Sequence, residues 1–173
     1  METLPIIVPG KIVLLSAPAK DTMLTIAARM ALAGPVYVLD AGNQFDAYWV
    51  ARLVRQQVVT VEPVLNRIHV ARAFTCYQVV TLFEQTVCAA VPCLVLDLLA
   101  TFYDENVPLP ESYRLLEVVL GHLKRLCQAV PVVLSVSAPR LKERACLAQA
   151  VTDLADYLFT WETPVSVAPT RLL

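Results

Sequence analysis

The chain has 173 residues, of which 57% are hydrophobic and 17% are charged, and its formal net charge is −1. That length fits one domain with a substantial core. The near-neutral charge excludes a strong overall attraction to DNA or to an anionic membrane. The mean hydropathy of +0.60 is high, but Arg29, Glu84, Asp97 or prolines interrupt the apolar runs. None reaches the roughly 18 to 20 residues of a membrane-spanning helix, so we expect buried parallel strands and an apolar surface that a partner covers.

Short apolar runs alternate with helical patterns along the whole chain. Strands are predicted at residues 12–16, 36–40, 68–74, 93–98, 132–137 and 157–161, and helices at 23–32, 45–57, 77–90, 111–128 and 140–154. Strands and helices that alternate through short connections predict a single doubly wound α/β domain with a mostly parallel sheet. We expect residues 1–8 to form an N-terminal arm, residues 9–162 the core and residues 163–173 a tail.

The cysteines and histidines carry no recognisable site pattern. The five cysteines form no C-x-x-C pair, and Cys88, Cys93 and Cys127 lie in apolar stretches. They are typical of small core residues in a reduced compartment and not of a zinc site or disulfide set. No acidic or thiol partner in the sequence accompanies His69 or His122, so we assign neither a catalytic role. We expect a cytoplasmic protein, associated with the nucleoid or lying in the nucleus according to the cell type, and no bound metal.

The segment after the first strand has the layout of a phosphate-binding loop without its glycines. A strand, a loop with a lysine and a helix follow one another, but residues 17–21 contain no glycine. Glycines let backbone N–H groups close around phosphate. Lys20 could take the position of the phosphate-loop lysine, or Thr22 could take that of the magnesium-binding hydroxyl. In either case Asp21 would bring a carboxylate toward a triphosphate, and the two negative charges would repel each other. The alternative is that Asp21 caps the helix and Lys20 is solvated.

Asp97 directly follows the apolar residues 93–96. A carboxylate at the carboxyl end of a buried strand is the Walker B pattern, in which it holds magnesium. Together with Lys20, Asp21 and Thr22, Asp97 would form a vestigial nucleotide pocket. The alternative is that Asp97 bonds the Lys20 region or caps backbone groups, because the same pattern recurs at residues 36–40.

Four segments, in the same order and at matching separations, resemble the ATPase core of the RecA/RadA recombinase superfamily, and most closely its archaeal and eukaryotic branch. Residues 9–16 resemble the entry to its phosphate loop, and residues 38–45 its strand carrying Asp-Thr-Glu-Gly-x-Phe. Residues 66–74 resemble its Asn-…-Ala-Arg-Ala-Phe segment, and residues 97–103 its Walker B strand and exit. The resemblance covers residues 9 to about 162 and implies a RecA-like P-loop NTPase core.

Three parts of the hydrolysis machinery that this resemblance implies are missing. The phosphate-loop glycines are absent, and Gly42 stands where the family has the glutamate that activates water. Residues 135–139, at the exit of the fifth strand, lack the glutamine that senses the γ-phosphate. The resemblance therefore implies a degenerate, non-catalytic paralogue, a pseudo-ATPase.

The two segments that would be DNA-binding loops are also altered. Residues 104–111, after the Walker B strand, are acidic and would repel phosphate. Arg140, Lys142 and Arg144 follow the fifth strand and predict at most weak contact with a DNA backbone. The alternative is an ordinary solvated helix face beside Glu143.

Taken together, the residues and the resemblance predict a non-catalytic RecA/RadA-like paralogue that acts through protein contacts in DNA recombination or repair. Its expected partner is a RecA-like recombinase or paralogue, or a second copy of itself, with no membrane contact. No resident cofactor is expected. Two alternatives stay open: a regulator that binds ATP or ADP without hydrolysing it, and an active ATPase with an unusual phosphate loop.

Overall fold

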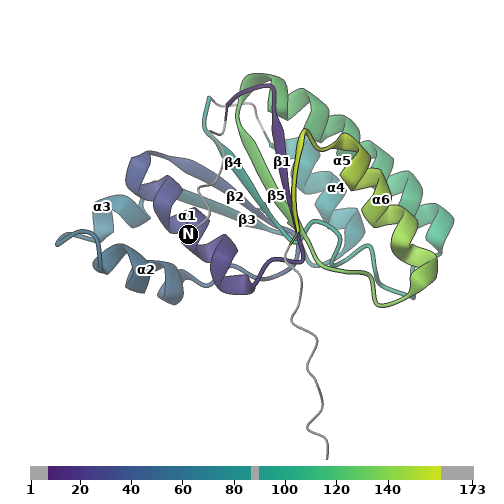
Figure 1. Cartoon of the computed structure of the whole chain (residues 1–173), viewed down its shortest axis with the longest axis horizontal. Helices are drawn as coiled ribbons and strands as arrows, with labels where there is room; N and C mark the ends of the chain where they lie inside the picture. The colour runs from purple at the N-terminus through teal and green to yellow at the C-terminus, as the bar shows by residue number, and fades with distance from the viewer. Residues whose placement is uncertain (1–7, 87–89, 161–173) are drawn as a thin grey trace, which may run out of the picture.

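The computed structural model describes residues 8–86 and 90–160 (Figure 1). Within these residues, six parallel strands form one sheet in the order β3-β2-β4-β5-β1-β6. The strands are β1 (Ile12–Ser16), β2 (Val36–Asp40), β3 (Ile68–Arg72), β4 (Cys93–Leu96), β5 (Val132–Val136) and β6 (Tyr157–Thr160). The helices are α1 (Lys20–Ala33), α2 (Ala47–Arg55), α3 (Glu62–Leu65), α4 (Cys76–Gln85), α5 (Leu109–Ala129) and α6 (Ala145–Leu154). The prediction of an α/β fold with a parallel sheet is confirmed.

Helices cover both faces of the sheet, with α1 and α2 on one side and α4, α5 and α6 on the other (Figure 1). Side chains alternate between the faces of a strand. In β1, Val13 and Leu15 therefore pack into the cluster under α1 and α2, whereas Ile12 and Leu14 join the cluster under α4 to α6. The central strands β4 and β5 are buried along their whole length, which explains their continuous apolar sequence.

The strand order decides where a site can form. Strands β4 and β5 lie between β2 and β1, so the order differs from both the Rossmann and the flavodoxin-like orders. Crossovers between parallel strands are right-handed, which sends the chain from β1 and β2 to one face and the chain from β3, β4 and β5 to the other. The connections after the neighbouring strands β2 and β4 therefore go to opposite faces of the sheet. The same holds for the connections after the neighbours β5 and β1.

The start of α1 differs from the prediction. The helix begins at Lys20, its N-cap is Ala19, and no side chain bonds the cap. The interpretation of Asp21 as the capping residue is therefore wrong. Asp21 lies in the first helical turn instead, where a carboxylate stabilises the positive end of the helix dipole.

Several other boundaries are shorter than predicted. β4 ends at Leu96 because the next residue, Asp97, has a left-handed backbone with φ of 45°. A short 3₁₀ helix (η1, Lys142–Arg144) precedes α6, so a single helix over residues 140–154 is wrong. The four-residue helix α3 is an addition to the predicted elements. Helix α4 ends at Gln85 with Thr86 as its C-cap, so the prediction of a helix up to residue 90 is wrong. Most of the N-terminal arm and the tail at 163–173 lie outside the described residues.

Candidate functional site

The site forms where loops from four strands meet at the carboxyl edge of the sheet. Ligands of open α/β sheets bind outside the carboxyl ends of strands whose connections diverge. Here two adjoining cavities of about 170 and 480 Å³ lie at that edge, and we call them together the switch-point crevice. The larger one has a volume typical of a small-ligand pocket. Residues that line the crevice include Ala17, Gly42, Gln44, Asp97, Tyr103, Asp104, Ser137 and Arg140.

Asp97 is the central polar residue of the crevice and is only 6% exposed. Its Oδ1 accepts hydrogen bonds from the backbone N–H and the hydroxyl of Ser137, both at 2.9 Å. Its Oδ2 accepts one from Gln44 Nε2 at 2.9 Å. Asp97 therefore ties the segments after β2, β4 and β5 together. This outcome matches the prediction that Asp97 caps backbone groups, and neither of these partners belongs to the Lys20 region.

Burial raises the pKa of Asp97, because a carboxylate in a low-dielectric site loses its hydration. The two hydrogen bonds from Ser137 oppose that shift, and the nearby Asp40 carboxylate adds to it. Tyr103 donates a hydrogen bond to the Ser137 carbonyl oxygen at 3.1 Å. Burial, and next the charge of Asp97, also raise the pKa of Tyr103, so its phenol stays protonated and keeps donating at neutral pH.

Gly42 leaves no room for a side chain beside Asp97. A Cβ at position 42 would stand 2.5 Å from the Asp97 Cβ, a distance that requires the backbone to move. The position where the resemblance implies a catalytic glutamate is therefore filled by the neighbouring strand exit. Asn43, the next residue, has φ of 53°, and Ala17, which also lines the crevice, has φ of 51°. With Asp97, three non-glycine residues near one site adopt the left-handed region, which concentrates backbone strain there.

The loop after β1 is too short to cradle a phosphate. Only residues 17–19 separate β1 from α1. The Ala17 N–H donates to the Val136 carbonyl oxygen at 2.7 Å, and Pro18 has no N–H to offer. The loop is thereby fastened to β5 and presents few backbone donors to the crevice. A phosphate cradle needs several donors aimed at one point.

Of the four residues predicted to form a nucleotide pocket, Asp97 lies in the crevice and the other three lie at the start of α1. Lys20 and Asp21 are exposed and Thr22 is half-buried. The residues that line the described cavities of the crevice include Asp97 but not Lys20, Asp21 or Thr22. The Thr22 N–H closes the first turn of α1 on the Ala19 carbonyl oxygen at 3.0 Å. These three residues therefore form the first turn of α1.

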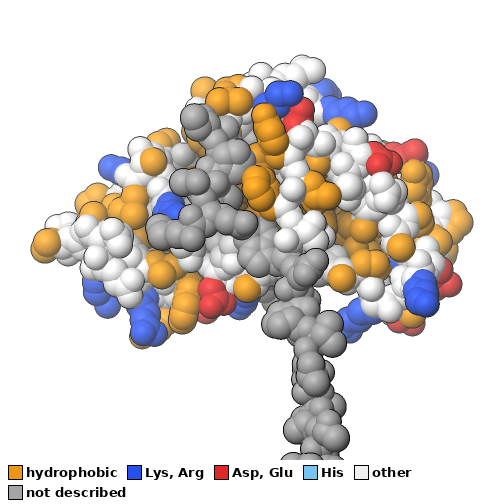
Figure 2. All heavy atoms as spheres, viewed as in Figure 1, with side chains coloured by type: hydrophobic (Ala, Val, Ile, Leu, Met, Phe, Trp, Pro, Cys, Tyr) orange, Lys and Arg blue, Asp and Glu red, His pale blue; other side chains and the backbone are white. Residues whose placement is uncertain are grey.

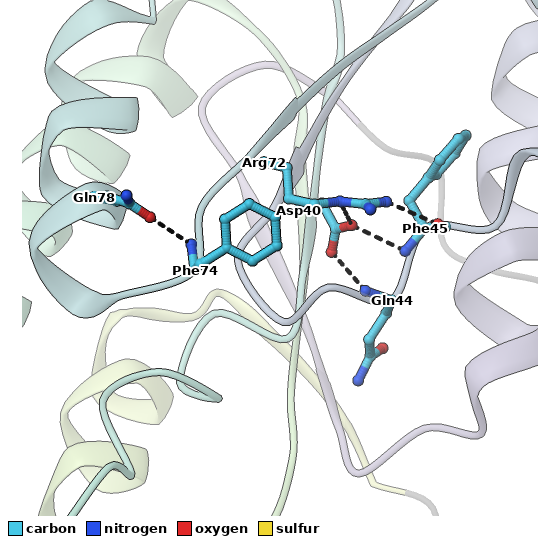
Figure 3. Close-up of polar contacts among 6 residues, drawn as sticks. All are labelled: Asp40, Gln44, Phe45, Arg72, Phe74 and Gln78. Carbon is cyan, nitrogen blue, oxygen red and sulfur yellow. Dashed lines mark hydrogen bonds and ion pairs between the residues drawn. The ribbon is translucent and has the colours of Figure 1, made fainter. Parts of the chain in front are cut away.

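A second buried carboxylate, Asp40, has no role in the sequence-based prediction. It is fully buried and forms an ion pair with Arg72 Nε at 2.8 Å. Asp40 also accepts hydrogen bonds from the N–H groups of Gln44 and Phe45, while Arg72 donates to the Phe45 carbonyl oxygen (Figure 3). This network fixes the loop after β2 and so places Gln44 against Asp97. The signal that could have revealed it is an acidic residue ending one strand and a basic residue ending its neighbour.

The three cations predicted after β5 have different environments. Arg140 and Lys142 are exposed, as weak contact with a DNA backbone requires. The prediction is wrong for Arg144, which is only 4% exposed. Its guanidinium donates to the carbonyl oxygens of Phe102 at 2.7 Å and Val107 at 2.6 Å. Arg144 therefore fastens the loop after β4 and is not free to bind phosphate.

The comparisons with known proteins supply no family. No protein-family model matches the chain, and no curated protein does. Within residues 8–86 and 90–160, no group of three or more His, Cys, Asp and Glu side chains is placed to hold a metal ion. In the same part of the chain, none of the helices is long and apolar enough to cross a membrane.

The chemistry of the crevice is that of a self-contained hydrogen-bond network. The carboxylate of Asp97, the hydroxyl of Ser137, the amide of Gln44 and the phenol of Tyr103 satisfy one another or nearby backbone groups. Satisfied buried networks rigidify the segments they join. The hydrogen bonds between these groups therefore help to fix the shape of the crevice.

Proposed function

We propose that this chain is a non-catalytic member of the RecA/RadA superfamily that works through protein contacts, in DNA recombination or repair. The observation that carries the proposal is the short loop between β1 and α1. This loop has only three residues, and its first N–H, that of Ala17, is bonded to β5, so few backbone donors are left for a phosphate. The four resembling segments are the ground for the superfamily assignment, and two of them, residues 38–45 and 97–103, line the crevice.

The geometry of Asp97 supports the loss of hydrolysis. In a working site the corresponding carboxylate holds magnesium through water. Here both carboxylate oxygens of Asp97 already accept hydrogen bonds from Gln44 and Ser137. Magnesium would compete with these donors for the carboxylate, and burial disfavours the charged form that magnesium needs.

The absence of a side chain at Gly42 supports the same proposal. A general base must lie within hydrogen-bond reach of the attacking water. Gly42 packs against Asp97 instead, so a carboxylate could be restored there only by moving the strand exits. Removing one such catalytic group typically lowers a rate by about 10² to 10³-fold. The phosphate-binding glycines and the general base are two different groups, and both are missing.

The test combines nucleotide binding with phosphate release. We expect no saturable binding of fluorescent ATP or ADP analogues at concentrations up to about 1 mM, and no magnesium-dependent phosphate release above the rate without protein. Lys20→Ala is the matched variant, because it removes the only lysine next to the loop while leaving the crevice intact. It should behave like the parent.

Each alternative function has its own outcome in this experiment. Saturable binding without phosphate release would establish the nucleotide-binding regulator in place of our proposal. Phosphate release that disappears in Lys20→Ala would establish an active ATPase. Affinity purification from the native cells then addresses the partner, with a RecA-like protein or the chain itself as the expected co-purifying species.

A further inference from the structure

A second hollow lies beside the crevice, between the end of β3 and the loop after β4. It has a volume of about 310 Å³ and is lined by Phe74, Tyr77, Ala100, Thr101, Asp104 and Val107, among others. We call these six residues the aromatic groove. Phe74 is 64% exposed and Tyr77 50% exposed, and exposed aromatic side chains beside a hollow are the usual anchors of protein interfaces. The Phe74 N–H donates to Gln78 Oε1, which holds the backbone of Phe74 against α4 (Figure 3).

The polar groups of the aromatic groove are suited to bind a cation that has several N–H donors. Two hydrogen bonds from Asn106, at 2.9 and 2.8 Å, both reach Asp104 Oδ1. They lower the pKa of Asp104, so the carboxylate is charged at neutral pH. Its Oδ2 accepts no hydrogen bond from the residues the structure describes, and in that part of the chain Thr101 Oγ1 is buried without a partner.

An arginine side chain fits this combination. A guanidinium stacks on aromatic rings and donates to carboxylates through several N–H groups. Other cations are near Asp104: Arg140 lines the crevice, and Arg144 is buried beneath the loop. Neither forms an ion pair with Asp104 among the described residues, so its free oxygen stays available to a partner.

The chain itself presents such an arginine on α2. Tyr48, Arg52 and Arg55 are exposed and lie four and three residues apart, so they share one face of the helix. Arg52 stacks over the Trp49 ring at 5.5 Å, whereas Arg55 makes no contact of this kind within the described residues. Neither arginine forms an ion pair with another described residue. The side of the molecule that carries α2 and α3 shows basic and hydrophobic side chains next to one another (Figure 2).

We propose that Arg55 of one copy enters the aromatic groove of a second copy, between Phe74 and Tyr77, and pairs with Asp104. This inference rests on the proposed function, for which it names the contact. Arg55 lies in the last turn of α2, on one face of the sheet, whereas Tyr77 of the groove belongs to α4 on the other face (Figure 1). The two surfaces are therefore different parts of the molecule, and joining them makes a head-to-tail row of copies.

Sedimentation equilibrium of the full chain with two single variants tests the contact. We expect the parent to associate at micromolar concentration and to associate less as salt rises from about 50 to 500 mM, because the contact contains an ion pair. Arg55→Ala and Asp104→Ala should each sediment as the single 19.1 kDa chain. An equimolar mixture of the two should form a one-to-one dimer, since one intact arginine and one intact groove remain.

Matched control variants remove the same charges elsewhere. Arg29→Ala on α1 and Glu117→Ala on α5 alter exposed residues outside both surfaces and should associate like the parent. Phe74→Ala should weaken association at least tenfold by removing one wall of the groove. A far-ultraviolet spectrum and a melting curve like those of the parent establish that each variant is folded.

Three results would overturn the docking inference: a parent that stays monomeric at about 100 µM in low salt, a mixture that stays monomeric although the parent associates, or an Arg29→Ala variant that dissociates as readily as Arg55→Ala. None of these affects the proposed function, which depends on nucleotide binding and turnover. A parent that assembles as proposed but also hydrolyses ATP would instead overturn the proposed function alone.

Discussion

Gly42 and Asp97 are the pair on which the shape of the crevice depends most directly. We predict that Gly42→Ala lowers the free energy of unfolding by about 1–3 kcal/mol, because the added methyl group overlaps the Asp97 side chain and the strand exits must separate. Urea denaturation measures the change. Gly121→Ala is the control: nothing lies within 4 Å of a Cβ built there, and in the interior of α5 it should raise stability by about 0.5–1 kcal/mol. Equal effects of the two changes would contradict the packing described at Gly42.

The raised pKa of Asp97 makes a prediction about pH. An acid whose pKa is higher in the folded than in the unfolded protein binds protons more tightly when folded, so its contribution to stability falls as pH rises through that window. For Asp97 the window begins near the ordinary value of 3.8 and extends upward. Asp97→Asn removes this dependence while keeping an oxygen that accepts from Ser137.

The measurement is urea denaturation of parent and Asp97→Asn between pH 4 and 7. We expect the stability of the parent to fall relative to that of the variant across this range. The lowered pKa values of Asp104, Glu111 and Asp156 act in the opposite direction, but both proteins share them, so they cancel in the difference. A difference that stays constant with pH would show that Asp97 keeps the same charge in the folded and unfolded chain.

At the scale of residues, the sequence predicts the position of Asp97 but does not identify its hydrogen-bond partners. Asp97 follows a buried strand, and that local pattern is enough to place it at the carboxyl edge. Its partners Gln44 and Ser137 follow two other strands, so no pattern around Asp97 identifies them. The reason for Gly42 is contact with a residue far along the chain, so its role in packing leaves no local signal.

Among the elements, the loop after β4 owes its conformation to one buried arginine. Arg144 bridges the carbonyl oxygens at positions 102 and 107 and also donates to Ser112 Oγ at 3.2 Å. We predict that Arg144→Met lowers the free energy of unfolding by about 2–4 kcal/mol, because buried carbonyl groups lose charge-assisted partners. Amide hydrogen exchange should accelerate most in residues 103–108. Arg140→Met, on the exposed neighbour, should change stability by less than about 0.5 kcal/mol, and acceleration spread evenly over the sheet would contradict a local role for Arg144.

Element types were largely predictable, and element ends were not. Strands such as β1 and β5 are continuous apolar runs, and α5 has apolar residues at helical spacing. Burial therefore produces sequence patterns from which the type of each element can be predicted. The four residues of α3 are too few for a period, although Glu62 and Pro63 suit a first helical turn. The 3₁₀ helix at residues 142–144 depends on the burial of Arg144, which composition does not reveal, since three cations in five residues are equally typical of a solvated face.

For the whole molecule, the charge distribution makes a prediction about DNA. With Arg144 buried, Arg140 and Lys142 remain exposed, and Arg140 shares the larger cavity with the acidic Asp104. We expect no measurable binding to duplex DNA at about 150 mM salt. Any binding at about 50 mM should show a log–log salt slope near −2, since two cations release about two counterions, and should vanish when both become alanine. Fluorescence anisotropy measures both, and a slope steeper than about −4 would place the contact elsewhere.

The parallel sheet was predictable as a class, because strands and helices alternate. The order of its strands was not predictable from the residues, since neighbours in this sheet come from distant parts of the chain: Ile12 lies beside Val132, and Val13 beside Tyr157. No periodicity within a strand identifies its neighbours. The position of the crevice follows from that order, so it too appears only in the structure.

The placement of β1 has a consequence for how the protein is made. β1 is synthesised first, yet its two neighbours are β5 and β6, the last strands of the sheet to be translated. At about 5–20 residues per second, on the order of ten seconds separates β1 from β5 on the ribosome. During that interval the apolar residues 12–15 have no strand to pair with, and such a segment is prone to aggregate. Strands β3, β2 and β4 are adjacent in the sheet and can assemble meanwhile, so the segment that contains β1 needs protection until β5 has been translated.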